Sequence, residues 1–223
     1  MALTFPRAMP LGGADSQAFE IARVDYMTPR ASGRINSISA GFPLWSMTIT
    51  LNNGDVEETD EWRAWVPAQR GSSRLFFGTD LTRPFPKAYR QGFTGMTRAG
   101  GGAFSGAATS WSVNAERDVI TLSGLPANFI LGLNDYIGFK WTTGASARRS
   151  LVRAVEAVTG SAAGVLAVTV EPALPNLTPG SAVAYLDRPD CLMRLVPGQT
   201  SIAEIDTLHS AGGQISAIQD LLA

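Results

Sequence analysis

The stretch 44-LWSMTITLNNGDVEETDEWRAWVP-67 decides the fold, because it reads as a strand, a turn and a helix in direct succession. From Trp45 to Leu51, apolar side chains alternate with serine and threonine. A period of two is typical of a half-buried strand, and the dipeptide Asn53-Gly54 ends it as turn dipeptides do. We therefore expect a sheet with one face turned towards a core.

The helix expected from this stretch covers residues 55–66. Asp55 and Glu58 have the spacing of a capping box, and the acidic residues around them lie where the helix dipole favours negative charge. Trp62 and Trp65 belong to an apolar stripe at i, i+3 spacing. Pro67 is expected to end the helix, because the residue before a proline avoids helical geometry. Such a helix would lie on the sheet.

Short strands are expected on both sides of this stretch. Phe19 and Ile21 mark one before it, a turn region covers 29–33, and residues 74–78 read as a buried strand after the helix. Further strands recur at 110–113, 119–122, 136–141, 151–158, 165–170, 182–186 and 192–196. Such spacing without helical patterns favours a small antiparallel barrel or sandwich. Residues 214–222 fit a helix and a strand about equally well.

The glycine-rich segment 92–108, which contains Gly100-Gly101-Gly102, is the best candidate for a domain crossing, and we expect a hinge or an extended arm at 92–106. The chain is thus predicted to be mainly β. An N-terminal β-sandwich over 1–92 would carry the helix, and a second antiparallel β-barrel or sandwich would cover 93–187. If the C-terminal segment 188–223 returns to the first domain, the second domain is an insertion.

The composition limits the classes of function. The 223 residues are 45% apolar and 17% charged, which suits a chain with a buried core. The net charge of −1 offers no long-range attraction for nucleic acid or anionic lipid. The basic residues are sixteen arginines and only Lys87 and Lys140. This bias fits a GC-rich genome, or surfaces built for protein contacts, for which arginine is better suited.

Cysteine usage and apolar windows bear on the compartment. Cys191 is the only cysteine, so an intrachain disulfide is excluded. The N-terminal residues lack the apolar core of a secretion signal, and no window approaches the roughly 20 apolar residues of a membrane span. We therefore expect a product made in a cytoplasm, without membrane insertion.

Catalytic and metal-binding patterns are weak. His209 is the only histidine, with Asp206 as a conceivable orienting group, but no G-x-S-x-G elbow occurs. One cysteine and one histidine are too few for a zinc site. Asp187 and Asp190 have the residue type for a hard cation, although capping the turn between them is the simpler interpretation.

Two further patterns point only weakly to chemistry. The Gly100-x-Gly102 run resembles a dinucleotide-binding loop superficially, because Ser105 takes the place of the third glycine. Glu156 and Glu171 are conceivable partners in a glycosidase, but nothing in the sequence selects them. We expect neither enzymatic activity nor a cofactor nor a metal.

Aromatic residues are concentrated between positions 62 and 89. They are Trp62, Trp65, Phe76, Phe77, Phe85 and Tyr89. Such a cluster is typical of a protein-contact patch or a sugar-stacking platform, or of core packing, which we favour for Trp62, Phe76 and Phe77. Phe85 and Tyr89 alternate with cations and prolines and are harder to bury. The predicted partner interface therefore consists of Arg83, Phe85, Lys87, Tyr89 and Arg90.

Several ordered segments resemble tail proteins of long-tailed, siphovirus-type bacteriophages, and most closely the distal tail protein family. These segments are 60-DEWRAWV-66, 74-RLFFGTDLTRPFP-86, 135-DYIGF-139, 151-LVRAVEAV-158 and 187-DRPD-190. The resemblance implies a virion structural protein with a β-sandwich "belt" domain that carries one helix, plus a second β-domain. It also implies a homo-oligomeric, hexameric ring between the tail tube and the host-binding tip, through which DNA passes without specific binding.

Two other functions remain open at this point. A carbohydrate-binding module of the tail tip would use the tryptophan, tyrosine and phenylalanine side chains on an all-β frame. A wall-degrading hydrolase would need a carboxylate pair such as Glu156 and Glu171. Closed rings use one contact patch on each side of every subunit, and permanent interfaces are enriched in arginine and poor in lysine, so the composition favours the ring.

Overall fold

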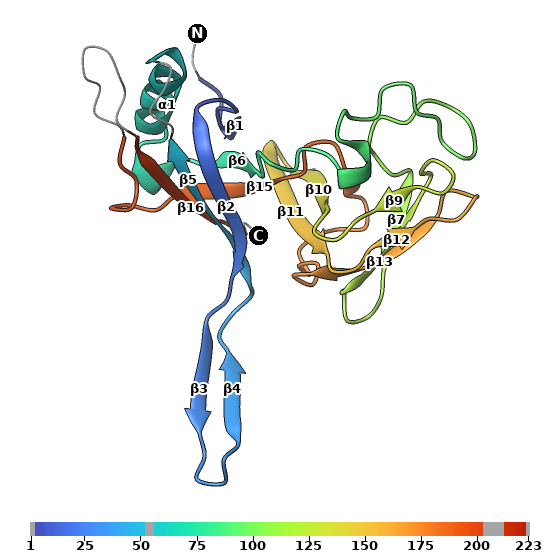
Figure 1. Ribbon diagram of the computed structural model, residues 1–223, viewed down its shortest axis with the longest axis horizontal. Helices are drawn as coiled ribbons and strands as arrows, with labels where there is room; N and C mark the ends of the chain where they lie inside the picture. The colour runs from blue at the N-terminus through green and yellow to red at the C-terminus, as the bar shows by residue number, and fades with distance from the viewer. Residues whose placement is uncertain (1–2, 52–55, 203–211, 222–223) are drawn as a thin grey trace. The chain divides into compact units, whose positions relative to one another are not determined.

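The computed structural model (Figure 1) describes residues 3–51, 56–202 and 212–221. The chain is 43% strand and 9% helix, which confirms the predicted mainly-β class. It divides into two compact units. We call residues 12–73 and 194–220 the hairpin unit, and residues 1–11, 74–193 and 221–223 the barrel unit. The domain boundaries expected after residues 92 and 187 stay predictions.

The hairpin unit contains an antiparallel sheet in the order β16-β5-β2. These strands are β2 (Ala14–Ala22), β5 (Leu44–Leu51) and β16 (Gln214–Gln219). Alternate side chains of β5, from Trp45 to Leu51, are buried, as the period of two predicts. The Trp45 ring stacks on Phe19 of β2 at 5.2 Å. Residues 214–219, for which the sequence left helix and strand open, form a strand beside β5.

The helix α1 (Val56–Ala68) confirms the one helix expected in this region. Trp62 and Trp65 are buried, and the indole Nε1 of Trp62 donates a hydrogen bond to the Gly12 carbonyl at 2.8 Å. The helix continues one residue past Pro67, so the predicted end is wrong by that margin; helix ends vary by this much because the last turn frays. Asp55 and the Asn53-Gly54 turn lie outside the described residues.

A two-stranded hairpin of this unit extends away from the β16-β5-β2 sheet (Figure 1). It consists of β3 (Asp25–Pro29) and β4 (Ile35–Ser39), paired from Asp25–Ser39 to Pro29–Ile35. Gly33 in the turn has a φ of 77°, and its N–H donates to the Arg30 carbonyl at 2.9 Å. Residues 23–42 are exposed without interruption.

The barrel unit contains a six-stranded antiparallel sheet in the order β14-β10-β11-β13-β8-β7. The strands are β7 (Ser110–Val113), β8 (Val119–Ser123), β10 (Tyr136–Thr143), β11 (Ser146–Ala154), β13 (Leu166–Glu171) and β14 (Val183–Tyr185). Ala107, just before β7, bridges to Tyr185, and the Ala108 N–H donates to the Ala184 carbonyl at 2.9 Å. The two ends of the sheet therefore meet, and the sheet is a barrel.

Short strands complete the barrel unit. They are β1 (Arg7–Ala8), β6 (Phe76–Thr79), β9 (Ile130–Leu131), β12 (Val158–Thr159) and β15 (Asp190–Leu195), which runs on into the hairpin unit. β6 pairs with β1 in parallel and with β15 in antiparallel orientation. The single strand expected at 151–158 is wrong in its bounds: β11 ends at Ala154, and residues 158–159 pair separately with β9.

The glycine-rich segment is not an extended arm. Thr97 bridges to Ala103, so the glycines around Gly101 form a tight turn. The guanidinium of Arg98 donates to the carbonyls of Ala107 and Gly124, which ties the turn to the barrel. Phe93 and Phe104, at the ends of the segment, are buried in the barrel core. A stretch of glycines that signals flexibility in sequence is fixed here by its aromatic flanks.

Candidate partner-binding surface

The predicted interface residues lie on a loop, residues 81–90, whose start is fixed by Asp80. One carboxylate oxygen of Asp80 accepts hydrogen bonds from the Thr82 N–H at 2.8 Å and the Thr82 hydroxyl at 2.6 Å. The other accepts from the Tyr136 hydroxyl at 3.0 Å. An aspartate that binds the backbone two residues on defines an Asx turn. Because Tyr136 belongs to β10, Asp80 also ties this turn to the barrel.

Asp135 fixes the middle of the same loop. Its buried carboxylate accepts from the backbone N–H of Lys87 at 3.0 Å and of Gly132 at 2.6 Å, and it lies 3.8 Å from Arg83 Nη1. Burial raises the pKa of Asp135, while these hydrogen bonds and the charges of Arg83 and Lys87 oppose the rise. These bonds tie the middle of the loop to residues 132–135 of the barrel unit.

Phe85 and Tyr89, expected to be hard to bury, are half-buried against the barrel core. Tyr89 stacks on Phe129 with ring centroids 4.5 Å apart, and its hydroxyl accepts from the Ile130 N–H at 2.9 Å. Phe85 makes an edge contact with Phe93 at 5.8 Å. The prolines on either side do not prevent burial, because the loop folds back onto the barrel. One face of the Tyr89 ring is therefore covered by Phe129, whereas Phe85 touches the core through an edge contact.

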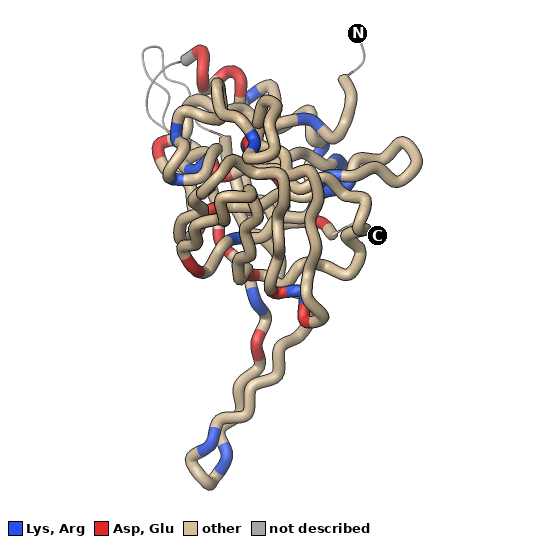
Figure 2. Tube along the Cα trace, turned by 90° about the vertical axis from the view of Figure 1, so that its right-hand side faces the viewer, with Lys and Arg blue, Asp and Glu red and all other residues tan. Residues whose placement is uncertain are grey.

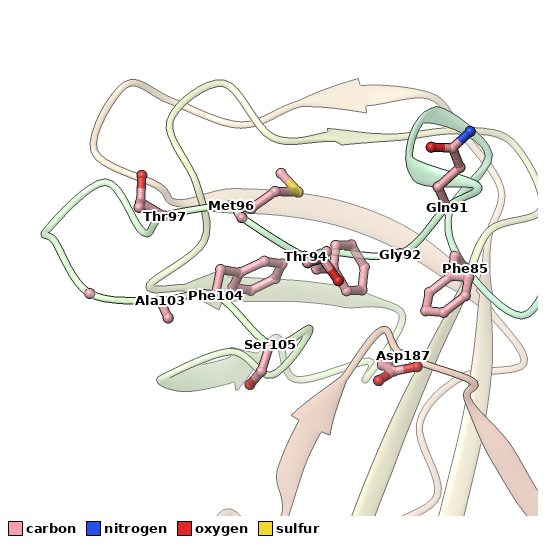
Figure 3. A pocket seen from close by; sticks show the side chains of 13 residues that line it. Phe85, Gln91, Gly92, Thr94, Met96, Thr97, Ala103, Phe104, Ser105 and Asp187 are labelled. Atoms are coloured by element: carbon pink, nitrogen blue, oxygen red, sulfur yellow. The ribbon is translucent and has the colours of Figure 1, made fainter.

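Three hollows of about 670, 560 and 530 Å³ meet at Phe85, which lines all of them. Figure 3 shows the largest, with Phe85 and Asp187 at one end and Thr97 and Ala103 at the other. It is lined mainly by apolar groups of the glycine-rich segment, such as Phe104. The other two hollows are basic.

The two basic hollows bring together cations from distant parts of the sequence. The first is lined by Arg83, Lys87 and Arg90, and the second by Lys140, Arg149 and Arg188. We call these six residues the basic surface. The sequence identified the first three, but it missed the second three because strand pairing, and not sequence proximity, brings them to Phe85. One signal was available: the chain has only two lysines, and each lines one of these hollows.

Arg149 belongs to a network beneath the second basic hollow. Its Nε lies 2.7 Å from Asp190 Oδ1, which also accepts from the Tyr185 hydroxyl at 2.8 Å. The guanidinium stacks over the Phe77 ring at 4.6 Å. Burial raises the pKa of Asp190 despite the nearby charge of Arg149. Burial likewise raises the pKa of Tyr185, with the Asp190 charge as the next cause.

Gly138 provides the space that this network needs. It lies directly opposite Tyr185 in the β10–β14 pair. A β-carbon at position 138 would overlap the Tyr185 ring, with its Cζ atom only 2.4 Å away. The phenol can lie flat across β10 because no side chain stands there.

The remaining candidates fall in separate places. Glu156 is exposed and accepts from the Thr169 hydroxyl at 2.6 Å and N–H at 2.9 Å, and these bonds lower its pKa. A glycosidase acid needs a raised pKa, so Glu156 does not suit that role. Asp190 is paired with Arg149, while Asp187 lies exposed at the hollows. His209 and Asp206 lie outside the described residues.

Within residues 3–51, 56–202 and 212–221, no group of three or more potential metal ligands gathers, and no helix is long and apolar enough to cross a membrane. No protein-family model matches the chain, and none of the curated proteins matches its sequence. The resemblance to distal tail proteins therefore stays a prediction, and function has to be argued from the features described above.

Proposed function

We propose that this chain is a non-enzymatic structural protein of a long-tailed phage tail, whose copies form a ring that joins the tail tube to the host-binding tip. The observation that carries the proposal is the hairpin β3–β4. A two-stranded hairpin alone is at best marginally stable in water, and three strands or a packing partner are normally needed. This hairpin has neither among the residues that the structure describes.

The hairpin carries large apolar side chains on both faces. Tyr26 and Ile38 are directly paired and share one face, whereas Met27, Pro29 and Ile35 point to the other. The exposed fractions of four of these side chains are 65% for Tyr26, 69% for Met27, 67% for Ile35 and 69% for Ile38. Contiguous apolar exposure of this kind marks an interaction surface. An arm that is apolar on both faces suits insertion between neighbours in an assembly.

Charge favours a second copy as the neighbour. The hairpin turn carries Arg30 and Arg34, seen as the basic tip in Figure 2. The exposed side of α1 in the same unit carries three acidic residues, Glu57, Asp60 and Glu61, and one cation, Arg63, which lies 3.6 Å from Asp60. An arm on one copy and an acidic helix on the next form a heterologous contact, which closes into a ring when the rotation permits. The low charge fraction and the preference for arginine agree with a subunit whose surface is largely covered.

The proposal is tested by the mass of the purified chain in solution, from light scattering, together with negative-stain images. We expect annular oligomers for the native chain and a monomer for the double variant Tyr26→Ser and Ile38→Ser. Ile130→Ser, an exposed apolar residue of the barrel unit, is the matched control and should keep the oligomer. A native chain that stays monomeric at high micromolar concentration contradicts the ring.

The station in the tail needs a separate measurement. Antibodies against the chain should label intact phage particles at the distal end of the tail tube. Labelling of the capsid, or along the whole tube, would contradict that station even if the chain forms rings.

A further inference from the structure

Four cations of the basic surface form no close ion pair in the part of the chain that the structure describes, although the charges of Lys87 and Lys140 act on Asp135 and Asp190. Arg83 lies by Asp135 and Arg149 by Asp190, so these two are held by carboxylates. Lys87, Arg90, Lys140 and Arg188 have no described carboxylate within 4.0 Å. Of the carboxylates that line the two basic hollows, Asp187 alone is unpaired. The unpaired set is therefore strongly positive on a chain whose net charge is −1.

The positions of these cations oppose internal stability. Lys140 on β10 is directly opposite Arg149 on β11, and like charges in opposed positions destabilise a sheet. Lys140 lies over the face of the Tyr185 ring, 5.0 Å from its Nζ, and its charge also acts favourably on Asp190. Arg188 adopts a φ of 47°, an uncommon conformation for a residue with a side chain. An arrangement that costs folding energy and collects charge of one sign is suited to an external anion.

The rim of the basic surface is apolar and exposed. The Leu133 carbonyl oxygen accepts a hydrogen bond from Arg83 Nη1 at 3.1 Å, while the Leu133 side chain stays exposed. The backbone N–H of Ile130 donates to the Tyr89 hydroxyl at 2.9 Å, and the Ile130 side chain is exposed as well. Val183 lies opposite Lys140 and is exposed beside the second basic hollow. Exposed apolar side chains thus border both groups of cations.

We propose that the basic surface binds an acidic protein segment that also carries apolar side chains. Guanidinium and ammonium groups would pair with its carboxylates, and the rim would contact its apolar side chains. A single-stranded nucleic acid is the competing ligand; it stacks its bases on several aromatic faces, and of the two aromatic residues in the loop Tyr89 has its ring stacked on Phe129. The proposal concerns the barrel unit and does not depend on the hairpin or on ring formation.

The test uses the full chain and a fluorescent peptide of alternating glutamate and leucine, with binding measured by fluorescence anisotropy. We expect the double variant Lys87→Glu and Lys140→Glu to weaken binding by about tenfold or more, and added salt to weaken it in the native chain. The matched control is Arg63→Glu and Arg70→Glu, two exposed positions of the hairpin unit outside the β3–β4 arm, which makes the same change in net charge and should alter binding by less than about twofold. Circular dichroism checks that each variant folds.

Three outcomes with the peptide and the charge-reversal variants overturn the proposal. The native chain fails to bind the peptide, or both double variants lose binding equally, so that net charge alone is responsible. In the third, a single-stranded oligonucleotide of the same charge binds more tightly than the peptide, and the surface is then a nucleic-acid site. If charge reversal perturbs the fold, Lys87→Gln with Lys140→Gln takes its place, with an expected loss of several fold. Unchanged binding in that variant also contradicts the assignment.

Discussion

The hairpins β3–β4 and β10–β11 share one local motif and have opposite environments. Both are antiparallel pairs joined by a short turn. β10–β11 lies between β14 and β13 in the barrel, and Phe139, Leu151 and Val152 are buried. Every residue of β3 and β4 is exposed. The hairpin motif therefore does not determine whether its residues are core or surface; the neighbouring strands do.

Hydrogen exchange should show the largest difference between the two hairpins. Amides of β10 and β11 exchange through unfolding of the barrel, which for a domain costs several kcal/mol, whereas amides of β3 and β4 open at a cost near zero. In the monomeric double variant Tyr26→Ser and Ile38→Ser we expect protection factors that differ by orders of magnitude. Assembly of the native chain should raise protection in β3–β4 selectively. Equal protection of both hairpins in the monomer would contradict the expectation that β3–β4 lacks packing within its own copy.

Truncation of one aromatic residue in each hairpin should give the next largest contrast. Phe139→Ala leaves a cavity in the barrel core and should lower the free energy of unfolding by about 3–5 kcal/mol. Tyr26→Ala removes an exposed side chain and should change the stability of the monomer by no more than about 0.5 kcal/mol. Urea unfolding monitored by tryptophan fluorescence measures both. A large loss for Tyr26→Ala would mean that the hairpin packs within its own copy.

The contribution of the Asp190–Arg149 ion pair to the stability of the barrel unit can be measured through its pH dependence. Because burial raises the pKa of Asp190 above its unfolded value of 3.8, the fold favours the protonated carboxyl, and stability should fall as the pH rises from 3.8 through the raised pKa. Asp190→Asn keeps an oxygen acceptor and should remove this part of the pH dependence without loss of stability at pH 7. Asp190→Ala leaves Arg149 and Tyr185 without that acceptor and should cost about 1–3 kcal/mol.

Thermal unfolding of the two variants as a function of pH provides the measurement. A destabilised Asp190→Asn variant at neutral pH would show that the ion pair with Arg149 outweighs the cost of its burial.

The smallest change in the free energy of unfolding is expected for a substitution at Lys140. Its sign shows whether the lysine opposes or supports the fold. Lys140→Glu replaces a like-charged pair with Arg149 by an opposite one, and should raise the free energy of unfolding by about 0.2–1 kcal/mol. The corresponding residue pairs in β3–β4 contain no such conflict, so Thr28→Glu, opposite Asn36, serves as a control near zero. A chemical denaturation series resolves the difference. Destabilisation by Lys140→Glu would identify the lysine as a structural residue.

The sequence predicted most of the local structure. The alternation in β5, the stripe of α1 and the strands β7, β8, β10 and β13 are visible as local periods or apolar runs. What the sequence does not contain is the identity of the neighbouring strand. Tyr26 and Ile38 look like core residues of a sheet until the pairing is known, and the C-terminal strand could be assigned only through its register with β5.

The candidate surface was predicted only in part for the same reason. Arg83, Lys87 and Arg90 lie within one loop and could be found together. Lys140 and Arg149 are brought together by the β10–β11 pairing, and the Arg188 N–H donates to the Pro84 carbonyl of the loop at 2.7 Å. The alternation of prolines and cations predicted that Phe85 and Tyr89 are hard to bury, but both are half-buried against the barrel core. Burial depends on how the loop folds back, which Asp80 and Asp135 determine over long sequence separations.

The missing side chain at Gly138 links two parts of the barrel unit. Tyr185, which fills that space, holds the barrel seam through its backbone bridge to Ala107 and caps the Asp190 carboxylate through its hydroxyl. A methyl group at position 138 would displace the Tyr185 phenol. The displacement would weaken the contact between the two ends of the barrel sheet and, at the same time, remove the hydroxyl that donates to Asp190. Through Gly138, closure of the sheet and the charge balance of the second basic hollow therefore depend on the same tyrosine ring.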